Sequence, residues 1–348
     1  MKRSISVFLF VVLILCFAQC LQAANFKGLI AEGIMDLKIE KGSPALLALT
    51  NATYVKVDGK TTEDYVDMIR ETTGCSVGKG NLLFFHRPVN HPLKIVLFRK
   101  DTADAVVMTY DGEKMGKLSL NIDSEEAAQP DIWKKIQEKV GSDTFSIVTI
   151  TNAWARGAPY DFLRCSEFHN HLCPGISTGY QIVTFIMDRY PLKEGENYIW
   201  IACPPWCKDD AIQILLDLTS GKQNLFVKQL TGDQKTAVLG ETLSDNIAGI
   251  LVIGHKKAKK GRAVALRYNW GKAWQVSGVT AKQFKPKGGP KNPIFWSSRI
   301  KCNLGLMPYL NTPESFVKVV KELEINPQMY AQMTIAGVNP YKVIGLSK

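Results

Sequence analysis

The sequence predicts an α+β protein made of two related units, each with a mixed or antiparallel sheet flanked by helices. Amphipathic helical patterns alternate with short runs of β-branched and apolar residues, which is typical of this class. Two similar helix–loop–strand segments also occur, over residues 64–82 and 210–225. Because a domain usually has about 100–200 residues, the chain has room for two. We place them at residues 24–154 and 155–348, after a signal peptide over residues 1–23.

The first 23 residues have the pattern of a secretory signal peptide. Lys2 and Arg3 precede an apolar run from Val7 to Phe17, and Leu21–Ala23 suits a cleavage site. The apolar run is too short to span a bilayer, so we expect a periplasmic or secreted protein without a membrane span. Removing the signal lowers the formal charge of +11 by two, which still favours anionic surfaces or ligands. Nucleic acid is not an expected partner of an exported protein.

In the first unit, an amphipathic helix is expected from Asp64, and it ends in the loop Thr73–Leu82. The strands expected here are Leu82–Phe85, Ile95–Phe98, Ala105–Met108 and Phe145–Thr151. Ala45–Tyr54 is expected to be a helix that corresponds to Gln181–Tyr190. This unit offers no convincing set of metal ligands, so we interpret it as a structural or partner half.

The second unit repeats this order with a helix from Asp210 to Leu218 and the loop Thr219–Leu225. The strands expected to follow are Leu225–Val227, Ile250–Ile253 and Ala263–Leu266. The basic residues 256–262 between the last two strands are interpreted as a solvated hairpin loop. Thr312–Pro313 is expected to open a final helix. The Gly-Lys segments of the two repeated loops lack the P-loop pattern, and a helix end followed by a strand explains them better.

One segment, Phe168–Gly175, carries the chemistry that stands out in this sequence. His169, His171 and Cys173 alternate, so an extended chain would point all three to one side. Imidazole and thiolate together select zinc or a similar transition metal over calcium or magnesium. Cys207 starts another helical pattern downstream and is the expected further ligand. We therefore predict a metal site of His171, Cys173 and Cys207, with His169 as the fourth ligand or as a residue that supports the ligands.

Both thiols lie where a helix is expected to begin. Cys173 suits an N-cap with Pro174 at the first helical position, and Cys207 precedes the helix that contains Asp210. The unpaired N–H groups and the positive end of the helix dipole stabilise a thiolate there. Asp210 in the first turn either favours the helix locally or takes part in metal ligation or proton transfer. Export also permits disulfides, between Cys207 and either Cys173 or Cys203, and between Cys165 and Cys302.

The stretch Phe168–Gly175, followed by Cys207–Gln213 and Gly221–Leu225, resembles the FmdE family, which is named after formylmethanofuran dehydrogenase. Such proteins commonly carry FHGHxCPG, a later cysteine with an aspartate three residues on, and a TGCxxGKGNL loop. The first unit keeps that loop at Thr73–Leu82, which makes it a degenerate FmdE-like unit, whereas the second is the metal-binding unit. Asn170 replaces the usual glycine, and the loop at Thr219–Leu225 lacks the usual cysteine.

This resemblance implies an α+β core, a zinc-type site and frequent dimerisation. Dehydrogenase activity is not carried over, because the family name comes from a cytoplasmic enzyme and this chain has a signal-peptide pattern. The leading hypothesis is an exported protein that binds zinc or another transition metal ion, and with it a small ligand or a metallocofactor. The alternatives are a thiol–disulfide oxidoreductase that uses Cys173 and Cys207, and a binding module with a structural metal. The sequence singles out no reaction.

Overall fold

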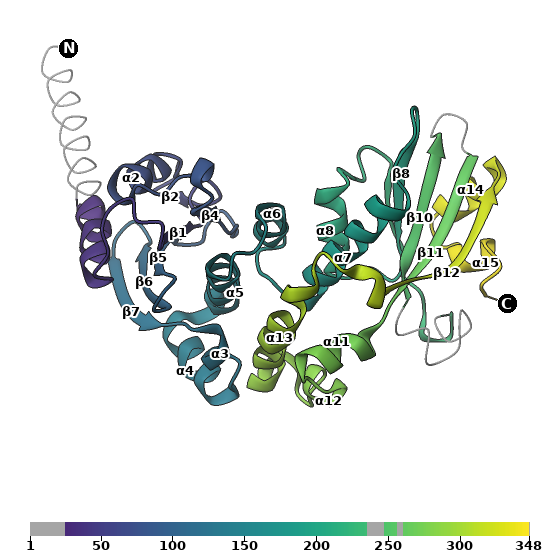
Figure 1. The fold of residues 1–348 in the computed structure, drawn as a ribbon. Coiled ribbons are helices and arrows are strands. Elements are labelled where there is room, and N and C mark those ends of the chain that lie inside the picture. The colour runs from purple at the N-terminus through teal and green to yellow at the C-terminus, as the bar shows by residue number, and fades with distance from the viewer. Residues whose placement is uncertain (1–24, 235–246, 256–259, 348) are drawn as a thin grey trace, which may run out of the picture. The chain divides into compact units, whose positions relative to one another are not determined.

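The computed structural model describes residues 25–234, 247–255 and 260–347 (Figure 1). The predicted signal peptide lies outside these residues, as does most of the basic loop at 256–262. Within the described part of the chain, no helix is long and apolar enough to cross a membrane. Contacts divide the chain into two compact units, one with the residues up to Asp123 plus Ile136–Gly157, the other with Ser124–Lys135 plus Ala158–Lys348.

The first unit contains a five-stranded mixed sheet in the order β4-β1-β5-β6-β7. Its elements are a helix over residues 25–36, β1 (Leu46–Thr50), β2 (Lys56–Val57), β3 (Lys60–Thr61), α2 (Asp64–Thr73), β4 (Leu82–Phe84), β5 (Leu93–Arg99), β6 (Asp104–Tyr110), β7 (Met115–Asn121) and α5 (Thr144–Ala155). β4 runs parallel to β1, and all other neighbours are antiparallel. Leu46, Ala48, Ile95 and Leu97 face the helix of residues 25–36 and α2 in one apolar core.

The second unit contains a five-stranded sheet in the order β9-β8-β10-β11-β12. Its main elements are α6 (Tyr160–His169), α7 (Pro174–Arg189), β8 (Asn197–Ala202), α8 (Lys208–Leu215), β9 (Leu225–Val227), β10 (Ile247–His255), β11 (Lys260–Tyr268), α11 (Trp270–Ser277), α12 (Ala281–Phe284), α13 (Pro293–Leu306), β12 (Val317–Ile325), α14 (Pro327–Thr334) and α15 (Pro340–Val343). The short α3 (Ser124–Ala127) and the first half of α4 (Pro130–Val140) also belong to this unit.

Both faces of the second sheet are covered at its centre, which explains why β8 and β10 are buried and apolar at most positions, whereas the edge strand β12 carries several charged residues. Trp200 and Leu251 belong to the core that contains residues of α7, α8, α11 and α13. The alternate residues Ile201 and Ile250 pack with α14 and α15 on the opposite face. Figure 1 shows α7 and α8 beside one face of this sheet and α14 and α15 beside the other. The predicted α+β class with mixed sheets is therefore confirmed.

The two sheets share strand order and strand direction. In each, the shortest strand is parallel to the first strand of the sheet, and the other pairs are antiparallel. The N–H of Ala48 donates to Asn81, and the N–H of Trp200 donates to Asn224, at the same point of the two parallel pairs. This register matches β1 with β8, so Ala45–Tyr54 is not the counterpart of Gln181–Tyr190.

The loops at Thr73–Leu82 and Thr219–Leu225 also make the same hydrogen bonds. The side-chain oxygen of Asn81 accepts from the N–H of Ser76 at 3.0 Å, and that of Asn224 accepts from the N–H of Thr219 at 2.8 Å. Each loop lysine donates to the carbonyl oxygen five residues before it, Lys79 to Gly74 and Lys222 to Asp217. Because these amide and lysine groups hold the loop itself, a phosphate-binding role is not needed to explain them.

Three elements differ from the sequence-based expectation. Ala45–Tyr54 contains strand β1, whose five residues are all buried, and such a short apolar run has no periodicity that separates strand from helix. Phe145–Thr151 is not a strand but lies in α5, whose β-branched residues are buried all round. Thr312–Pro313 opens only a single 3-10 turn, because Val317–Ile325 forms strand β12 on the edge of the sheet. The helices expected from Asp64, Pro174 and Asp210 are confirmed as α2, α7 and α8.

Candidate metal centre

The His–Cys motif lies at a turn between two helices rather than in an extended segment. His169 is the last residue of α6, and Asn170 ends the helix with a left-handed backbone, φ 71°. Cys173 is the N-cap of α7, with Pro174 in the first helical turn as predicted. The chain reverses between these helices, so the last turn of α6 and the first turn of α7 bring His169 and Cys173 together.

Cys207 reaches the same place because α8 crosses α7 at very close range. It is the N-cap of α8. A Cβ atom on Gly175 would lie 2.5 Å from the Cβ atom of Cys207, and a Cβ atom on Gly179 would collide with the carbonyl oxygen of Lys208. These two glycines are one helical turn apart on α7. They form the flat surface on which the start of α8 rests.

His169, Cys173 and Cys207 form a group whose ligand atoms all lie within 4.8 Å of one another. The Nε2 atom of His169 is 3.7 Å from the Sγ atom of Cys173. Donors around a tetrahedral zinc ion are separated by roughly 3.5–4 Å, so a small contraction would let the three residues hold one ion. His171 does not belong to this group, and its ring centre lies 4.3 Å from that of His169.

Asp210 holds the histidine in place. Its Oδ2 atom is 2.6 Å from Nδ1 of His169, which leaves Nε2 for the thiols. A carboxylate on the far nitrogen is the usual support of a metal-binding histidine. Burial favours neutral His169, but the hydrogen bonds with Asp210 and Cys207 outweigh it and raise the pKa of His169 to about 9. The sequence left open a local role at the helix start, metal ligation or proton transfer for Asp210, and this contact adds a further role, support of the ligand histidine.

The two thiols differ in charge although they lie side by side. A hydrogen bond from Cys173 lowers the pKa of Cys207 to about 5, against the effect of burial and with the help of His169. Burial and the neighbouring Cys207 raise the pKa of Cys173 well above its ordinary value. The metal-free site is therefore a thiolate, a thiol and an imidazolium in contact, and an incoming cation would replace the protons.

Several residues that sequence reasoning missed fix this geometry. The buried Asp209 accepts from the indole of Trp200 at 2.7 Å and from the N–H of Trp206 at 2.7 Å, and it pairs with Lys208 at 2.8 Å. These contacts tie the start of α8 to β8. Asn303 on α13 donates to the carbonyl oxygen of Leu172 at 2.7 Å and so holds the turn before Cys173. The charged residues at the start of α8 give a weak sequence signal that Asp209 supports the site. Nothing in the sequence near Asn303 indicates that it contacts the site.

All six cysteines in the described residues are free thiols in this structure. Cys165, Cys203 and Cys302 are buried in the second unit, and burial raises the pKa of Cys165 and of Cys302 to about 12. A buried, neutral thiol behaves as a small apolar side chain. Cys173 is buried as well, but it and Cys207 lie beside each other and beside His169, which gives these two cysteines surroundings that suit metal or thiol chemistry.

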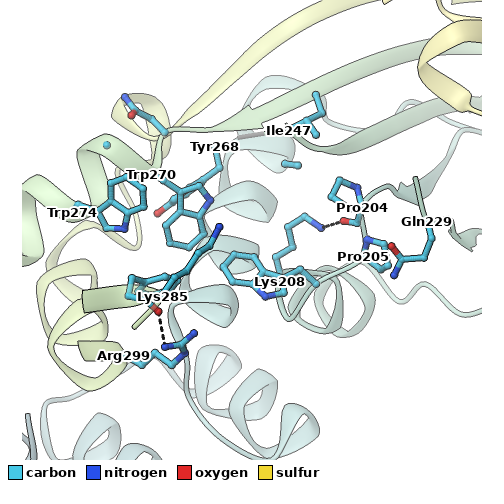
Figure 2. A pocket seen from close by; sticks show the side chains of 15 residues that line it. Pro204, Pro205, Lys208, Gln229, Ile247, Tyr268, Trp270, Trp274, Lys285 and Arg299 are labelled. Carbon is cyan, nitrogen blue, oxygen red and sulfur yellow. Dashed lines mark hydrogen bonds between the residues drawn. The ribbon is translucent and has the colours of Figure 1, made fainter. Parts of the chain in front are cut away.

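A cavity of about 710 Å³ lies in the second unit next to the start of α8 (Figure 2). Trp206 and Lys208, which flank Cys207, form part of its wall. Figure 2 shows Trp270, Trp274 and Lys285 on one side of the cavity and Pro204, Pro205 and Gln229 on the other. The lining comes from separate segments of the chain, so no local sequence pattern indicates it.

The fold and the site define a class of protein in which two cysteine thiols at helix starts and a histidine at a helix end meet on one face of a mixed sheet. Residues 168–301 match the family model FmdE, described as "FmdE, Molybdenum formylmethanofuran dehydrogenase operon". This segment therefore belongs to the FmdE family, and it contains His169, Cys173, Cys207 and the cavity's Arg299. The resemblance inferred from the motifs is confirmed for the second unit. No curated protein matches the chain.

Proposed function

We propose that this chain is an exported protein whose FmdE domain binds a transition metal ion, with zinc as the first candidate, at His169, Cys173 and Cys207. The observation that carries the proposal is the convergence of three soft or borderline donors within 4.8 Å from three helix ends. The donor chemistry fits, because thiolate and imidazole favour zinc over magnesium or calcium. Asp210 provides the support that a ligand histidine requires.

Three protein ligands would leave one position for water or for a small ligand, which is the pattern of catalytic zinc sites rather than structural ones. The four-ligand set that the sequence allows would also include His171, whose ring centre lies 4.3 Å from that of His169. When bound, the metal would supply Lewis acidity and a positive charge at the edge of the cavity. The protein's residues would orient the ligand and exclude water from it.

The first unit is proposed to be a related unit without a metal centre of its own. The shared strand order, the matching register and the identical loop hydrogen bonds support an internal repeat. We propose export to the periplasm or beyond because of the N-terminal sequence pattern. N-terminal sequencing of the protein from expressing cells is expected to begin at Ala24, and a retained Lys2 and Arg3 would argue against export.

Metal analysis of the mature protein, purified under reducing conditions, tests the main proposal. We expect about one equivalent of zinc or a related ion in the wild type and a large loss in Cys173→Ser and Cys207→Ser. Cys75→Ser is the matched control, because Cys75 is a buried thiol of the first unit. Less than roughly a tenth of an equivalent of any transition metal in the wild type would overturn the proposal.

A chelator then separates an open site from a structural one. If the metal serves as a binding or catalytic centre, its removal should leave the circular dichroism spectrum nearly unchanged, because α7, α8 and the sheet share a large apolar core. If the second unit instead requires the metal to fold, as in a binding module with a structural ion, chelation should unfold it.

Thiol–disulfide exchange is the second candidate function, and the adjacent thiols of Cys173 and Cys207 favour it. Oxidation would join their two sulfurs with the loss of two protons and two electrons to a disulfide of the substrate. Metal-free protein should then reduce a model disulfide, and Cys207→Ser should abolish this reaction. Exchange at the rate of a free thiol in solution would leave the metal-binding function as the better account.

A further inference from the structure

The cavity in the second unit has the size and the position of a ligand site. Its volume of about 710 Å³ falls within the roughly 300–1,000 Å³ of small-molecule sites. It reaches the candidate metal centre through Trp206 and Lys208, the two chain neighbours of Cys207. Arg299, also in its wall, lies close enough to Cys207 to be influenced by the charge of its thiolate.

Aromatic side chains dominate one side of the cavity. The ring centres of Trp206 and Trp270 are 5.0 Å apart, and Trp270 lies 5.0 Å from Tyr268 and 5.6 Å from Phe284. Trp206 remains 42% exposed although it belongs to this cluster. An indole left open beside other aromatic rings offers a stacking surface for a flat ligand, and such contacts contribute beyond simple burial.

The charged groups in the wall are all cationic. Lys208 is neutralised by Asp209 at 2.8 Å, and no carboxylate lines the cavity among the described residues. Arg299 uses Nη1 to donate to the carbonyl oxygens of Phe284 and Phe295, at 3.0 and 2.7 Å. Its other N–H groups have no acceptor, and neither Arg299 nor Lys285 has a carboxylate partner, in the part of the chain that the structure describes.

The aromatic rings around Arg299 also favour its role in recognising an anion. The guanidinium lies 3.3 Å from the ring centre of Phe295 and 4.5 Å from that of Phe284, so aromatic packing holds it in position. Burial lowers the pKa of Arg299 to about 10, which leaves the group charged at neutral pH. An isolated, partly buried cation with free donors is a recognition point for a carboxylate or a similar anion.

We propose that this cavity binds a small planar aromatic molecule with an anionic group, its ring against Trp206 and Trp270 and its anion at Arg299 and Lys285. The inference rests on and deepens the proposed function, because Trp206 and Lys208 of the cavity wall are the chain neighbours of the proposed ligand Cys207. The aromatic surface and the two unpaired cations nevertheless belong to the protein itself. Binding of the ring and of the anion is therefore expected in the metal-free protein as well.

Calorimetric titration of the full mature protein with 1-naphthoate tests the ligand class. Two matched compounds serve as controls: 1-naphthalenemethanol has the rings without the charge, and cyclohexanecarboxylate has the charge without an aromatic ring. We expect saturable binding of one 1-naphthoate per chain, at least about tenfold tighter than either control. Equal affinity for 1-naphthoate and its neutral analogue, or no binding at all, would overturn the inference.

Variants then locate the bound molecule. Lys285→Gln and Trp206→Leu are each expected to weaken 1-naphthoate binding by about fivefold or more, because they remove one charge or one stacking surface. Lys282→Gln, on the short helix α12 just before Lys285 but outside the cavity, and Trp154→Leu, in the first unit, should leave it unchanged. Lys285 is exposed, so its replacement does not threaten the fold. Equal effects of the two lysine variants would count against the site.

Parallel titrations with and without zinc separate the two proposals. Binding of 1-naphthoate by Cys207→Ser protein that takes up no zinc is the expected result for a cavity that acts independently. Wild-type protein that binds 1-naphthoate but neither zinc nor another transition metal would refute the metal proposal alone. Wild-type protein that binds zinc but does not prefer 1-naphthoate over the controls would refute the ligand proposal alone.

Discussion

His169 and His171 are two positions apart, and α6 ends between them. The helical turn carries His169 over Cys173, whereas His171 follows the left-handed Asn170 and lies beside the group of three donors. The sequence-based prediction named His171 with the two cysteines and left His169 as the fourth ligand or a supporting residue, since an extended segment would have pointed both histidines to one side. The local backbone therefore reverses the order of preference between the two histidines.

Replacement of each histidine by alanine should distinguish their roles. His169→Ala removes one of three converging donors, so we expect metal affinity to fall by at least about a hundredfold, whereas His171→Ala should lower it by less than about tenfold. Asp210→Asn should fall between them, at roughly 10–100-fold. Competition with a chromophoric chelator measures all three. A larger loss in His171→Ala than in His169→Ala would contradict the geometry.

Asn170 stands where the family motif usually has glycine, and its backbone conformation explains how this replacement is accommodated. Its φ of 71° is costly for most residues, and asparagine tolerates it better than others. The buried side-chain oxygen of Asn170 has no hydrogen-bond partner within the described residues, so the amide adds little beyond this tolerance. The replacement thus keeps the turn that the glycine would make.

Two substitutions at Asn170 test this account by urea unfolding. Asn170→Gly should change the free energy of unfolding by less than about 0.5 kcal/mol, because glycine adopts the same φ readily. Asn170→Val should lower it by roughly 1–2 kcal/mol, because a β-branched residue is strained in the left-handed region. Similar stabilities of the two variants would mean that the side chain, not the backbone, matters here.

The sequence predicted most of this site at the level of residues but not its shape. Cys173 and Cys207 could be identified because a thiol at a helix start has a local signature. The His169–Asp210 contact could not be derived, because it depends on how the end of α6 lies against the start of α8. Asn303 and Arg299 reach the site from α13, more than 120 residues after Cys173, so no local pattern reveals them.

At the scale of elements, the close crossing of α7 and α8 controls the distance between the two thiols. It depends on Gly175 and Gly179, where any side chain would push against α8. The Cβ atom of Gly179→Ala would also lie 2.8 Å from the Cβ atom of Ala211. A separation of the helices would move Cys207, at the start of α8, away from Cys173.

Gly179→Ala should therefore lower both stability and metal affinity. We expect a loss of roughly 1–3 kcal/mol in the free energy of unfolding, as for overpacked cores, together with weaker metal binding. Gly28→Ala is the control, because Gly28 lies in the helix of residues 25–36 with open space around its Cα atom. That change should be neutral or stabilise by up to about 1 kcal/mol. Undiminished metal affinity in Gly179→Ala would show that the crossing does not set the site.

The apolar patterns of the helices and strands explain why some elements could be predicted and others could not. α2, α7 and α8 have an apolar stripe and clear starts, so periodicity was sufficient. β1 and α5 are buried on all sides, and a fully apolar run has no face from which to read its period. β12 follows a Thr–Pro start that mimics a helix, but its pairing with β11, some 50 residues earlier, decides its structure.

At the scale of the whole molecule, the two units share a sheet topology but differ in what their loops carry. The second unit has the donors and the cavity, whereas the corresponding loop of the first unit, after β1, holds neither histidine nor cysteine between Asn51 and Glu63. The first unit instead contains a buried ion cluster. Asp143, before α5, contacts both Lys94 of β5 and Arg87, and all three side chains are at most 12% exposed.

This cluster predicts how the stability of the protein depends on pH. Burial alone would raise the pKa of Asp143, but Lys94 and Arg87 outweigh it and lower the pKa below its ordinary value. The folded state therefore binds this proton less readily than the unfolded chain. The contribution of Asp143 is complete above its unfolded pKa of about 3.9 and disappears as the pH falls through the lower, folded pKa.

Asp143→Asn leaves Lys94 and Arg87 buried without a counter-charge, so we expect a loss of about 3–5 kcal/mol in the free energy of unfolding at pH 7. The gap between the wild type and the variant should stay constant down to about pH 5 and narrow below about pH 4, as the wild-type carboxylate becomes protonated. Urea unfolding followed by circular dichroism, from pH 7 to pH 3, measures it. Asp101→Asn removes the exposed partner of Arg99 and should change little at any pH. A gap that persists unchanged at pH 3 would mean that the charge of Asp143 does not hold the cluster together.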